Sequence, residues 1–196
     1  MLENLNKELF LLINHFAGQN TIIDKLSIVV AEYLPIVFIL LLLYLWFKTD
    51  KFKKEVLYSG YSALFWLFLN FIISQLYFHP RPFMDKIWNN IFFHIPETSF
   101  PSDHTTFMLA IAIQLLFFAK TRIIWTVLIL LALIWGSSRV FIGIHYPFDI
   151  LGSILTALLS ATIIYNFWEK LSLLNNFIYE VDKNICTKFK KIKESF

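Results

Sequence analysis

The stretch SIVVAEYLPIVFILLLLYLWF, residues 27–47, carries a single charged side chain, that of Glu32. A helix of about 20 mostly apolar residues crosses the hydrocarbon core of a bilayer. The stretch is therefore predicted to span a membrane, with a kink at Pro35, because proline contributes no backbone N–H to a helix. Four further runs of this kind follow, at residues 56–78, 103–119, 123–142 and 147–168.

Composition agrees with a protein built mainly from such runs. The 196 residues are 58% hydrophobic, 18% aromatic and 16% charged, whereas soluble domains average about 25% charged residues. The net charge of +3 is small and does not suggest nucleic-acid binding, and the single cysteine, Cys186, excludes an intrachain disulfide. We expect an all-α, polytopic membrane helical bundle of about five spanning helices, forming one membrane-embedded domain over residues 1–196.

The two ends of the chain differ from the spanning runs. Residues 1–18 place leucines and other apolar side chains on one helical stripe and end at Gly18, which is typical of a helix lying in the membrane interface. Residues 170–196 alternate apolar residues with lysines, and a basic amphipathic tail suits an anionic cytoplasmic leaflet. A partly disordered, solvated tail is the alternative for this segment.

The distribution of basic residues predicts the orientation. Twelve of the 17 Lys and Arg residues follow the first span, join the third and fourth spans, or follow the fifth. By the positive-inside rule this side is cytoplasmic. With five spans, the N-terminus and the connections that carry Arg81 and Arg139 then lie outside.

Polar residues gather in three motifs at the predicted outer face. These are HPRPF at 79–83, FPSDHTTF at 100–107 and SSRVFIGIHYPFD at 137–149. The candidate site residues are Arg81, Ser102, Asp103, His104, Arg139, His145 and Asp149.

The chemistry of these residue types fits phosphoryl transfer. Ser102 is a good N-cap for the third span, and a helix N-terminus attracts anions. Asp149, four residues after His145, can bind one imidazole nitrogen and leave the other free to attack. Arg81 and Arg139 match phosphate oxygens, and His104 suits general acid–base work.

Two other interpretations apply to the same residues. Two histidines and an aspartate are sufficient to bind zinc, but the neighbouring arginines would repel a cation. Alternatively, the polar residues only cap helices and reach toward the membrane surface, which explains one such residue better than seven.

At these motifs the sequence resembles the type 2 phosphatidic acid phosphatase superfamily of membrane lipid phosphatases. The third family signature is complete, with Ser138, Arg139, His145 and Asp149 at the family spacing. The second reads Pro101-Ser102-Asp103-His104, with Asp103 in place of glycine, and the first keeps Arg81-Pro82 but has Ser74 where the family has lysine. These departures resemble the bacterial, bacitracin-resistance-type branch of undecaprenyl pyrophosphate phosphatases.

The resemblance implies a role for each matching residue. His145 would attack the terminal phosphorus and form a phosphohistidine, Asp149 would orient it, and His104 would protonate the leaving oxygen and then activate water. Arg81, Ser102 and Arg139 would cradle the phosphate, Asp103 would tune His104, and no metal or other cofactor is required.

The resemblance also implies a substrate and a place in the cell. The substrate would be the polyprenyl lipid undecaprenyl pyrophosphate, and the protein would lie in the bacterial cytoplasmic membrane with its site facing the extracytoplasmic side. His79 is a candidate contact for the second phosphate. The alternatives are a phosphatidylglycerophosphate or phosphatidate phosphatase and, outside the enzymes, a lipid-binding or lipid-flipping protein.

Overall fold

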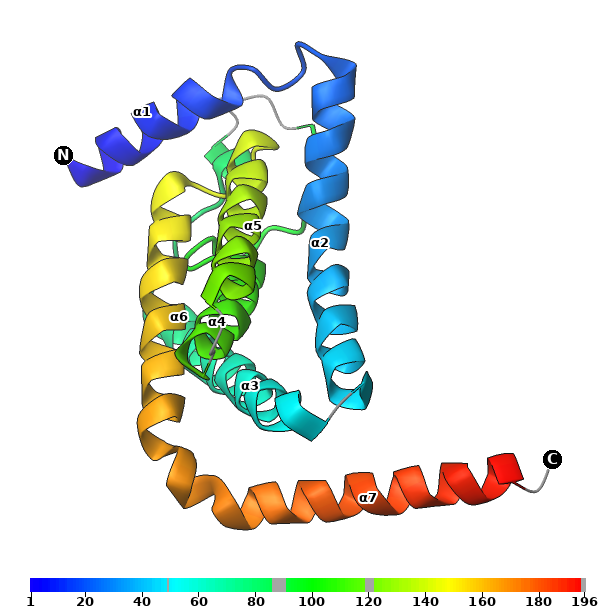
Figure 1. Cartoon of the computed structure of the whole chain (residues 1–196). Helices are drawn as coiled ribbons and strands as arrows, with labels where there is room; N and C mark the ends of the chain where they lie inside the picture. Colours follow the sequence, from blue (N-terminus) through cyan, green and yellow to red (C-terminus); the bar gives the residue numbers. More distant parts are fainter. Residues whose placement is uncertain (49, 86–90, 119–121, 195–196) are drawn as a thin grey trace.

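The protein is a bundle of α-helices, shown in Figure 1 as a computed structural model that describes residues 1–48, 50–85, 91–118 and 122–194. Within these residues there are α-helices and short 3-10 segments but no strand. The α-helices are α1 Leu2–Asn14, α2 Thr21–Lys48, α3 Lys53–Leu76, α4 Asp103–Phe118, α5 Arg122–Phe141, α6 Pro147–Phe167 and α7 Ser172–Glu194. The 3-10 segments are η1 Asp50–Phe52, η2 Pro82–Asp85 and η3 Trp168–Leu171. The prediction of an all-α membrane helical bundle is confirmed.

The helix α4 forms the centre of the bundle. It packs against α3, α5 and α6, and its side chains from Met108 to Ile113 are all buried. A helix that is apolar all round belongs in a protein core. The third predicted span is therefore an inner helix, and the other helices stand between it and the lipid.

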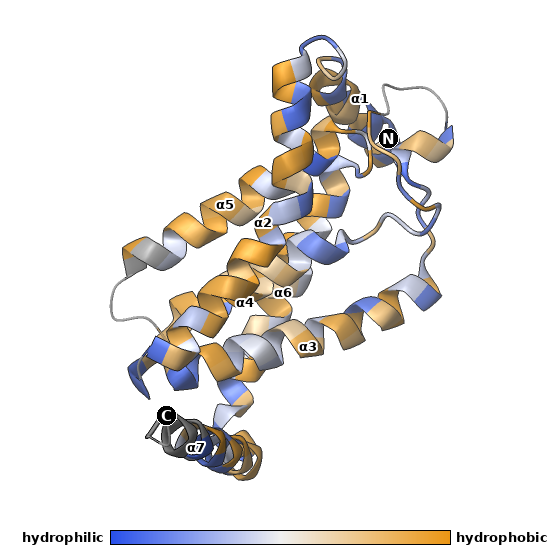
Figure 2. Ribbon diagram, turned by 90° about the vertical axis from the view of Figure 1, so that its right-hand side faces the viewer, coloured by the Kyte–Doolittle hydropathy of each residue, from blue (hydrophilic) through white to orange (hydrophobic). Residues whose placement is uncertain are grey.

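The helix α2 stands at the edge of the bundle, beside α5 (Figure 1). Its buried residues Ala31, Phe38 and Leu45 recur every seven positions, so one narrow stripe faces the protein and the remaining surface faces lipid. Three helical segments, beginning at Thr21, Asp50 and Pro147, are long and apolar enough to cross a membrane on their own, while α4 and α5 are shorter apolar helices. Figure 2 shows the apolar middle of these helices between more polar ends.

The helix α1 crosses the end of the bundle near the start of α2 (Figure 1). Its buried face consists of Asn6, Phe10 and Asn14. Asn6 Oδ1 accepts a hydrogen bond of 3.0 Å from the backbone N–H of Phe148, which satisfies one of the donors left open at the start of α6. Asn14 Nδ2 donates to the Phe141 carbonyl at the end of α5 over 2.8 Å. The exposed face of α1 keeps the apolar stripe that the sequence assigns to the membrane interface.

The helix α7 crosses the opposite end of the bundle, as the lower edge of Figure 1 shows. It is helical from Ser172 to Glu194, so the tail predicted from residue 170 onward is a second helix that lies across the bundle. The junction of α2 and α3 is at this end too, and brings Lys48 and Lys53 to the same side as α7.

A glycine at the contact of α4, α5 and α6 offers a test of the packing. A Cβ atom at Gly136 would lie 3.0 Å from Thr105 Cγ2 and 3.1 Å from Ile150 Cγ2, whereas one at Gly60 would meet nothing within 4 Å. Thr105 and Ile150 are buried and β-branched, so neither side chain can yield easily. We expect Gly136→Val to destabilise the protein by about 1–3 kcal/mol.

The matched control is Gly60→Val, which we expect to leave stability within about 0.5 kcal/mol of wild type. The measurement is the apparent melting temperature of the purified protein in detergent. Equal melting temperatures for the two variants would contradict the close contact at Gly136.

Candidate active site

The turn between α5 and α6 places the first two candidate residues. Gly143 has φ of +90°, a conformation that side chains with a Cβ rarely adopt, and so allows the chain to reverse after α5. Pro147 then begins α6 with a φ already suited to a helix. The Asp149 carboxylate folds back and accepts a hydrogen bond of 2.7 Å from the Tyr146 backbone N–H. His145 is thereby held directly beside the start of α6.

The Asp149 carboxylate is fully buried and has several donors. Its Oδ2 atom lies 3.3 Å from Nδ1 of His145 and also accepts a hydrogen bond from the Ser99 hydroxyl. A carboxylate on Nδ1 fixes the tautomer in which Nδ1 carries the proton. The other ring nitrogen of His145, Nε2, then carries the lone pair that a nucleophile requires.

Burial keeps His145 in its neutral form. The side chain is 1% exposed, and this burial lowers the pKa of His145 to about 3, although Asp149 acts in the opposite direction. At neutral pH the imidazole is therefore uncharged and able to attack an electrophile. Its Nε2 atom lies 3.0 Å from NH1 of Arg81.

Arg81 reaches this nitrogen from the segment that follows α3. Its NH1 also donates to the Ile144 carbonyl over 3.1 Å, and its NH2 pairs with Glu97 over 2.8 Å. The Nε atom is buried and has no hydrogen-bond partner among the residues that the structure describes. An unpaired, buried guanidinium N–H is costly, and an anion that accepts from it would remove that cost.

Arg139 is held near the end of α5 by a carbonyl of α2. Its NH1 donates to Ala31 O over 3.3 Å, and Trp135 Nε1 donates to the same oxygen over 3.0 Å. In a regular helix this oxygen would accept from the N–H of residue 35, but Pro35 has none. The proline thus leaves a carbonyl inside the bundle for Arg139 and Trp135, whose ring lies 4.9 Å from the guanidinium carbon.

A pocket of about 360 Å³ opens beside Arg139. His104, in the first turn of α4, lines it and is exposed, and His94 and Glu32 lie on the same wall. Burial, together with the charges of Arg81 and Arg139, lowers the pKa of His94. Arg139 lines this pocket and supplies a positive charge that an anion could meet, beside the carboxylate of Glu32.

The remaining two candidates have protein partners. Ser102 is buried directly before α4, and its hydroxyl lies 2.9 Å from Thr105 Oγ1. When Thr105 is the donor in this contact, the Ser102 hydroxyl keeps its own proton to donate to a phosphate. Asp103 Oδ1 accepts a hydrogen bond from Asn70 of α3, so its carboxylate is held toward α3. Among the described residues, no group of three or more His, Cys, Asp or Glu side chains could hold a metal ion.

Comparison with known families agrees with this geometry. The sequence pattern of the PAP2 superfamily matches residues 55–172, which include all seven candidate residues. The chain belongs to the PAP2 superfamily.

Individual relatives of this PAP2 protein extend the match over nearly the whole chain. It is 34% identical to the undecaprenyl-diphosphatase BcrC of Bacillus subtilis, over 95% of this chain and 96% of that protein. It is 33% identical to the putative undecaprenyl-diphosphatase YbjG of Escherichia coli, over 86% and 85% of the two chains. The crystal structure of Aquifex aeolicus LpxE superposes with a TM-score of 0.70 at 26% identity, covering 83% of this chain and 95% of that one.

Two residues of this PAP2 site carry contacts that the sequence motifs did not assign. Ser99 is fully buried, donates to Asp149 and lies 3.3 Å from His145 Nδ1. Glu97, which pairs with Arg81, comes from the same segment. A signal was present, because Ser99 directly precedes the FPSDH motif and Glu97 lies three residues before it.

His79 contacts two carboxylates. Its Nδ1 lies 3.4 Å from Asp149 Oδ1, and its Nε2 lies 3.4 Å from Glu3 Oε2 in α1. Asp149 has the largest influence and raises the pKa of His79. The structure therefore places His79 at Oδ1 of Asp149, while His145 lies at Oδ2, and both ring nitrogens of His79 are near protein carboxylates.

Ser99→Ala tests how far the nucleophile depends on a firmly held carboxylate. A hydrogen bond to a charged group contributes roughly 1.5–3 kcal/mol. We therefore expect kcat to fall roughly ten- to a hundredfold, with little change in KM, because the loosened Asp149 orients His145 less well. The matched control is Ser137→Ala, which removes an exposed hydroxyl that bonds only within α5. A wild-type kcat for Ser99→Ala would contradict this role.

Pro35→Ala tests the anchor of Arg139. Alanine restores an N–H that competes for the Ala31 carbonyl, and it is a far better helix former, by about 3 kcal/mol. We expect an unusual pair of effects: a higher melting temperature together with a KM raised about tenfold, because Arg139 loses its fixed position. Val37→Ala, at an exposed position of the same helix, should change neither quantity. An unchanged KM in Pro35→Ala would separate the proline from the site.

Proposed function

We propose that this PAP2 protein hydrolyses undecaprenyl diphosphate to undecaprenyl phosphate and inorganic phosphate. The single observation that carries the chemistry is the buried His145, with Nδ1 on the Asp149 carboxylate and Nε2 directed at a guanidinium. The names of the two bacterial relatives, both undecaprenyl-diphosphatases, support this substrate. The apolar surface of the bundle would let a polyprenyl tail remain in lipid while the diphosphate enters the site.

The first half of the reaction would transfer the terminal phosphoryl group to the protein. Arg81 and Arg139 bind the phosphate oxygens, and Nε2 of His145 attacks the terminal phosphorus in line with the bridging oxygen. The P–O bond to the lipid phosphate breaks as the P–N bond forms. His104, on the wall of the neighbouring pocket, gives its proton to the leaving oxygen.

The second half would restore the protein. His104, now neutral, removes a proton from a water molecule whose oxygen attacks the phosphorus of the phosphohistidine. The P–N bond breaks, inorganic phosphate leaves, and both histidines return to their starting forms. The sum is one water consumed for each diphosphate cleaved, and the positive charge that the transition state needs comes from the two arginines.

Phosphate release from purified protein tests this proposal. We expect release from undecaprenyl diphosphate to continue in EDTA, because Arg81 and Arg139 supply the positive charge, and to fall to background in His145→Ala. The control His15→Ala alters an exposed histidine of the α1 end and should retain activity.

A panel of lipids sharpens the test of the substrate. Faster turnover of phosphatidate or phosphatidylglycerophosphate would replace the substrate but keep the chemistry. Loss of activity in EDTA, restored by one divalent ion, would overturn the metal-free mechanism. Release by His145→Ala at the wild-type rate would overturn the nucleophile, and no release from any lipid would favour a lipid-binding or lipid-flipping protein.

We further propose that the protein lies in the bacterial cytoplasmic membrane with this site facing outward. The basic residues at the α7 end support that orientation by the positive-inside rule. A lipid carrier released as its diphosphate on the outer side of the membrane would be converted there to the monophosphate, ready for reuse.

Thiol labelling in intact cells tests the orientation. Gln19 is exposed in the connection between α1 and α2, and Cys186 is exposed on α7 at the other end. We expect an impermeant maleimide to label Gln19→Cys, made in a Cys186→Ser background, in intact cells. The native Cys186 should react only after lysis, and the reverse pattern would contradict an outward-facing site.

A further inference from the structure

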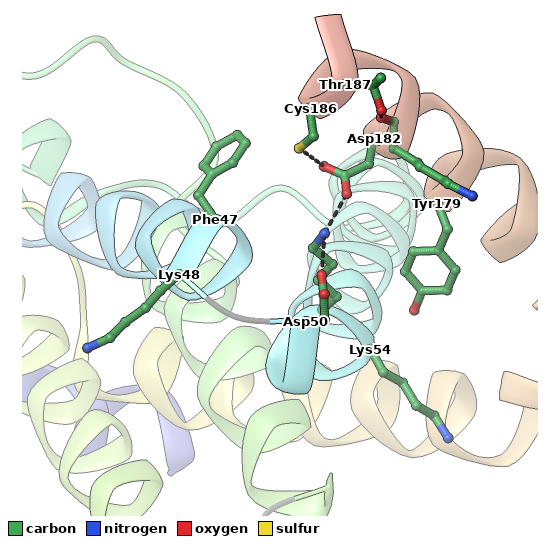
Figure 3. Close-up of a pocket in the computed structure, with 10 residues that line it drawn as sticks. Phe47, Lys48, Asp50, Lys54, Tyr179, Asp182, Cys186 and Thr187 are labelled. Carbon is green, nitrogen blue, oxygen red and sulfur yellow. Dashed lines mark hydrogen bonds and ion pairs between the residues drawn. The ribbon is translucent and has the colours of Figure 1, made fainter. Parts of the chain in front are cut away.

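A second and larger pocket lies at the end of the bundle far from His145. It has a volume of about 820 Å³ and forms a wedge between α7 and the junction of α2 with α3. Figure 3 shows Phe47 and Lys48 from one side and Tyr179 and Asp182 from the other. None of the residues matched to the phosphatase motifs lines it.

The two acidic groups of this wedge, Asp50 and Asp182, share a single lysine. Lys53 Nζ lies 2.6 Å from Asp182 and 2.7 Å from Asp50, and Trp46 Nε1 also donates to Asp182 over 2.8 Å. This cluster ties α7 to the α2–α3 junction.

Three other lysines that line the wedge, Lys48, Lys54 and Lys183, have no carboxylate partner among the described residues. In Figure 3 Lys48 and Lys54 extend away from the Asp182–Lys53–Asp50 cluster, and the four lysines of the wedge outnumber its two aspartates. Lysine ammonium groups sit on flexible stems that can turn toward a common anion. The wedge therefore has an excess of positive charge around its rim.

The level of the wedge relative to the bilayer follows from the helices that form it. The apolar run of α2 ends at Lys48, and α3 begins at Lys53. Lysines at the ends of spanning helices extend toward the interface, where phospholipid phosphates lie. The rim of the wedge is thus at the height of the headgroups on the α7 side.

The faces of α7 indicate how it meets the bilayer. One face contacts the bundle through Asn175 and Asp182, which bond to Tyr61 and Lys53. A second face carries exposed apolar side chains, those of Leu174, Phe177, Val181 and Ile185. At 100° per residue the two faces are about 105° apart, and the polar residues Asn176 and Glu180 lie opposite them. The wedge-lining residues Tyr179, Lys183 and Cys186 flank the bundle face on the side away from the apolar face. Bundle and lipid therefore lie on one side of α7, and water lies on the other.

We propose that the wedge binds the phosphate headgroup of an anionic phospholipid of the surrounding leaflet. Lys48, Lys54 and Lys183 contact the phosphate, and the acyl chains lie along the exposed ring of Phe47 at the end of α2. The lipid joins α7 to the end of α2 at the point where the protein itself leaves a gap. This binding does not depend on which lipid the active site hydrolyses.

Cys186 supplies a local probe, because the only cysteine of the chain lines the wedge. The rate of its reaction with a small neutral maleimide is measured for the full chain in nanodiscs of zwitterionic lipid, with and without an anionic phospholipid. We expect the anionic lipid to slow the reaction at least fivefold. Each lysine near such a surface contributes roughly fivefold in affinity, so the triple variant Lys48→Gln, Lys54→Gln, Lys183→Gln should lose this protection.

A matched triple variant controls for charge. This control combines Lys25→Gln, Lys170→Gln and Lys188→Gln, and so removes the same charge from exposed positions that do not line the wedge. It should keep the protection of Cys186 by the anionic lipid. The single variant Lys183→Gln, on exposed α7, covers the case in which the triple wedge variant fails to fold.

Several outcomes would overturn the proposal. The first is an equal rate of Cys186 labelling in the two kinds of nanodisc, and the second is an equal loss of protection in both triple variants. The third is full protection of Cys186 in the Lys183→Gln variant. The fourth is protection of Cys186 by inorganic phosphate in purely zwitterionic nanodiscs. The last result would assign the wedge to a free anion rather than to a lipid.

Discussion

The structure around the site depends on the burial of one carboxylate, that of Asp149. An ionised group without solvent must be matched by donors and opposite charge, or it destabilises the fold. Its hydrogen-bond partners are the Tyr146 N–H, the Ser99 hydroxyl and the His145 ring, and the His79 ring lies close by. They come from the α5–α6 turn and from both ends of the segment between α3 and α4. One side chain thus fixes how two connections far apart in the sequence pack against each other.

Two buried guanidinium groups set the second constraint. Arginine is almost never fully buried unless it is paired, and both Arg81 and Arg139 are 2% exposed. Arg81 is paired with the Ile144 carbonyl and the exposed Glu97, and Arg139 with the Ala31 carbonyl and the Trp135 ring. The Nε atom of each arginine has no hydrogen-bond partner among the described residues. This incomplete satisfaction in the free protein is what a bound phosphate would complete. In the proposed function, stability and phosphate binding would therefore rest on the same side chains.

The sequence predicts those features that depend on local spacing. The helices follow from apolar run length, and the pairing of His145 with Asp149 follows from one turn of separation at a helix start. Contacts that require the tertiary fold could not be predicted from the sequence. Asn6 caps α6 from 142 residues away, and Ser99 is 50 residues from Asp149. The sequence shows that Pro35 has no backbone N–H to donate. The residues that bond to the freed Ala31 carbonyl, however, are more than 100 positions away.

The contact between Arg81 NH1 and His145 Nε2 has a consequence for selectivity. In the proposed mechanism, a guanidinium N–H directed at the His145 lone pair would shield it from protons and stray electrophiles in the free protein. A ligand that draws the guanidinium onto its own oxygens uncovers the lone pair as it binds. Under that mechanism recognition and activation would be a single event, and a neutral lipid would leave the imidazole paired with Arg81.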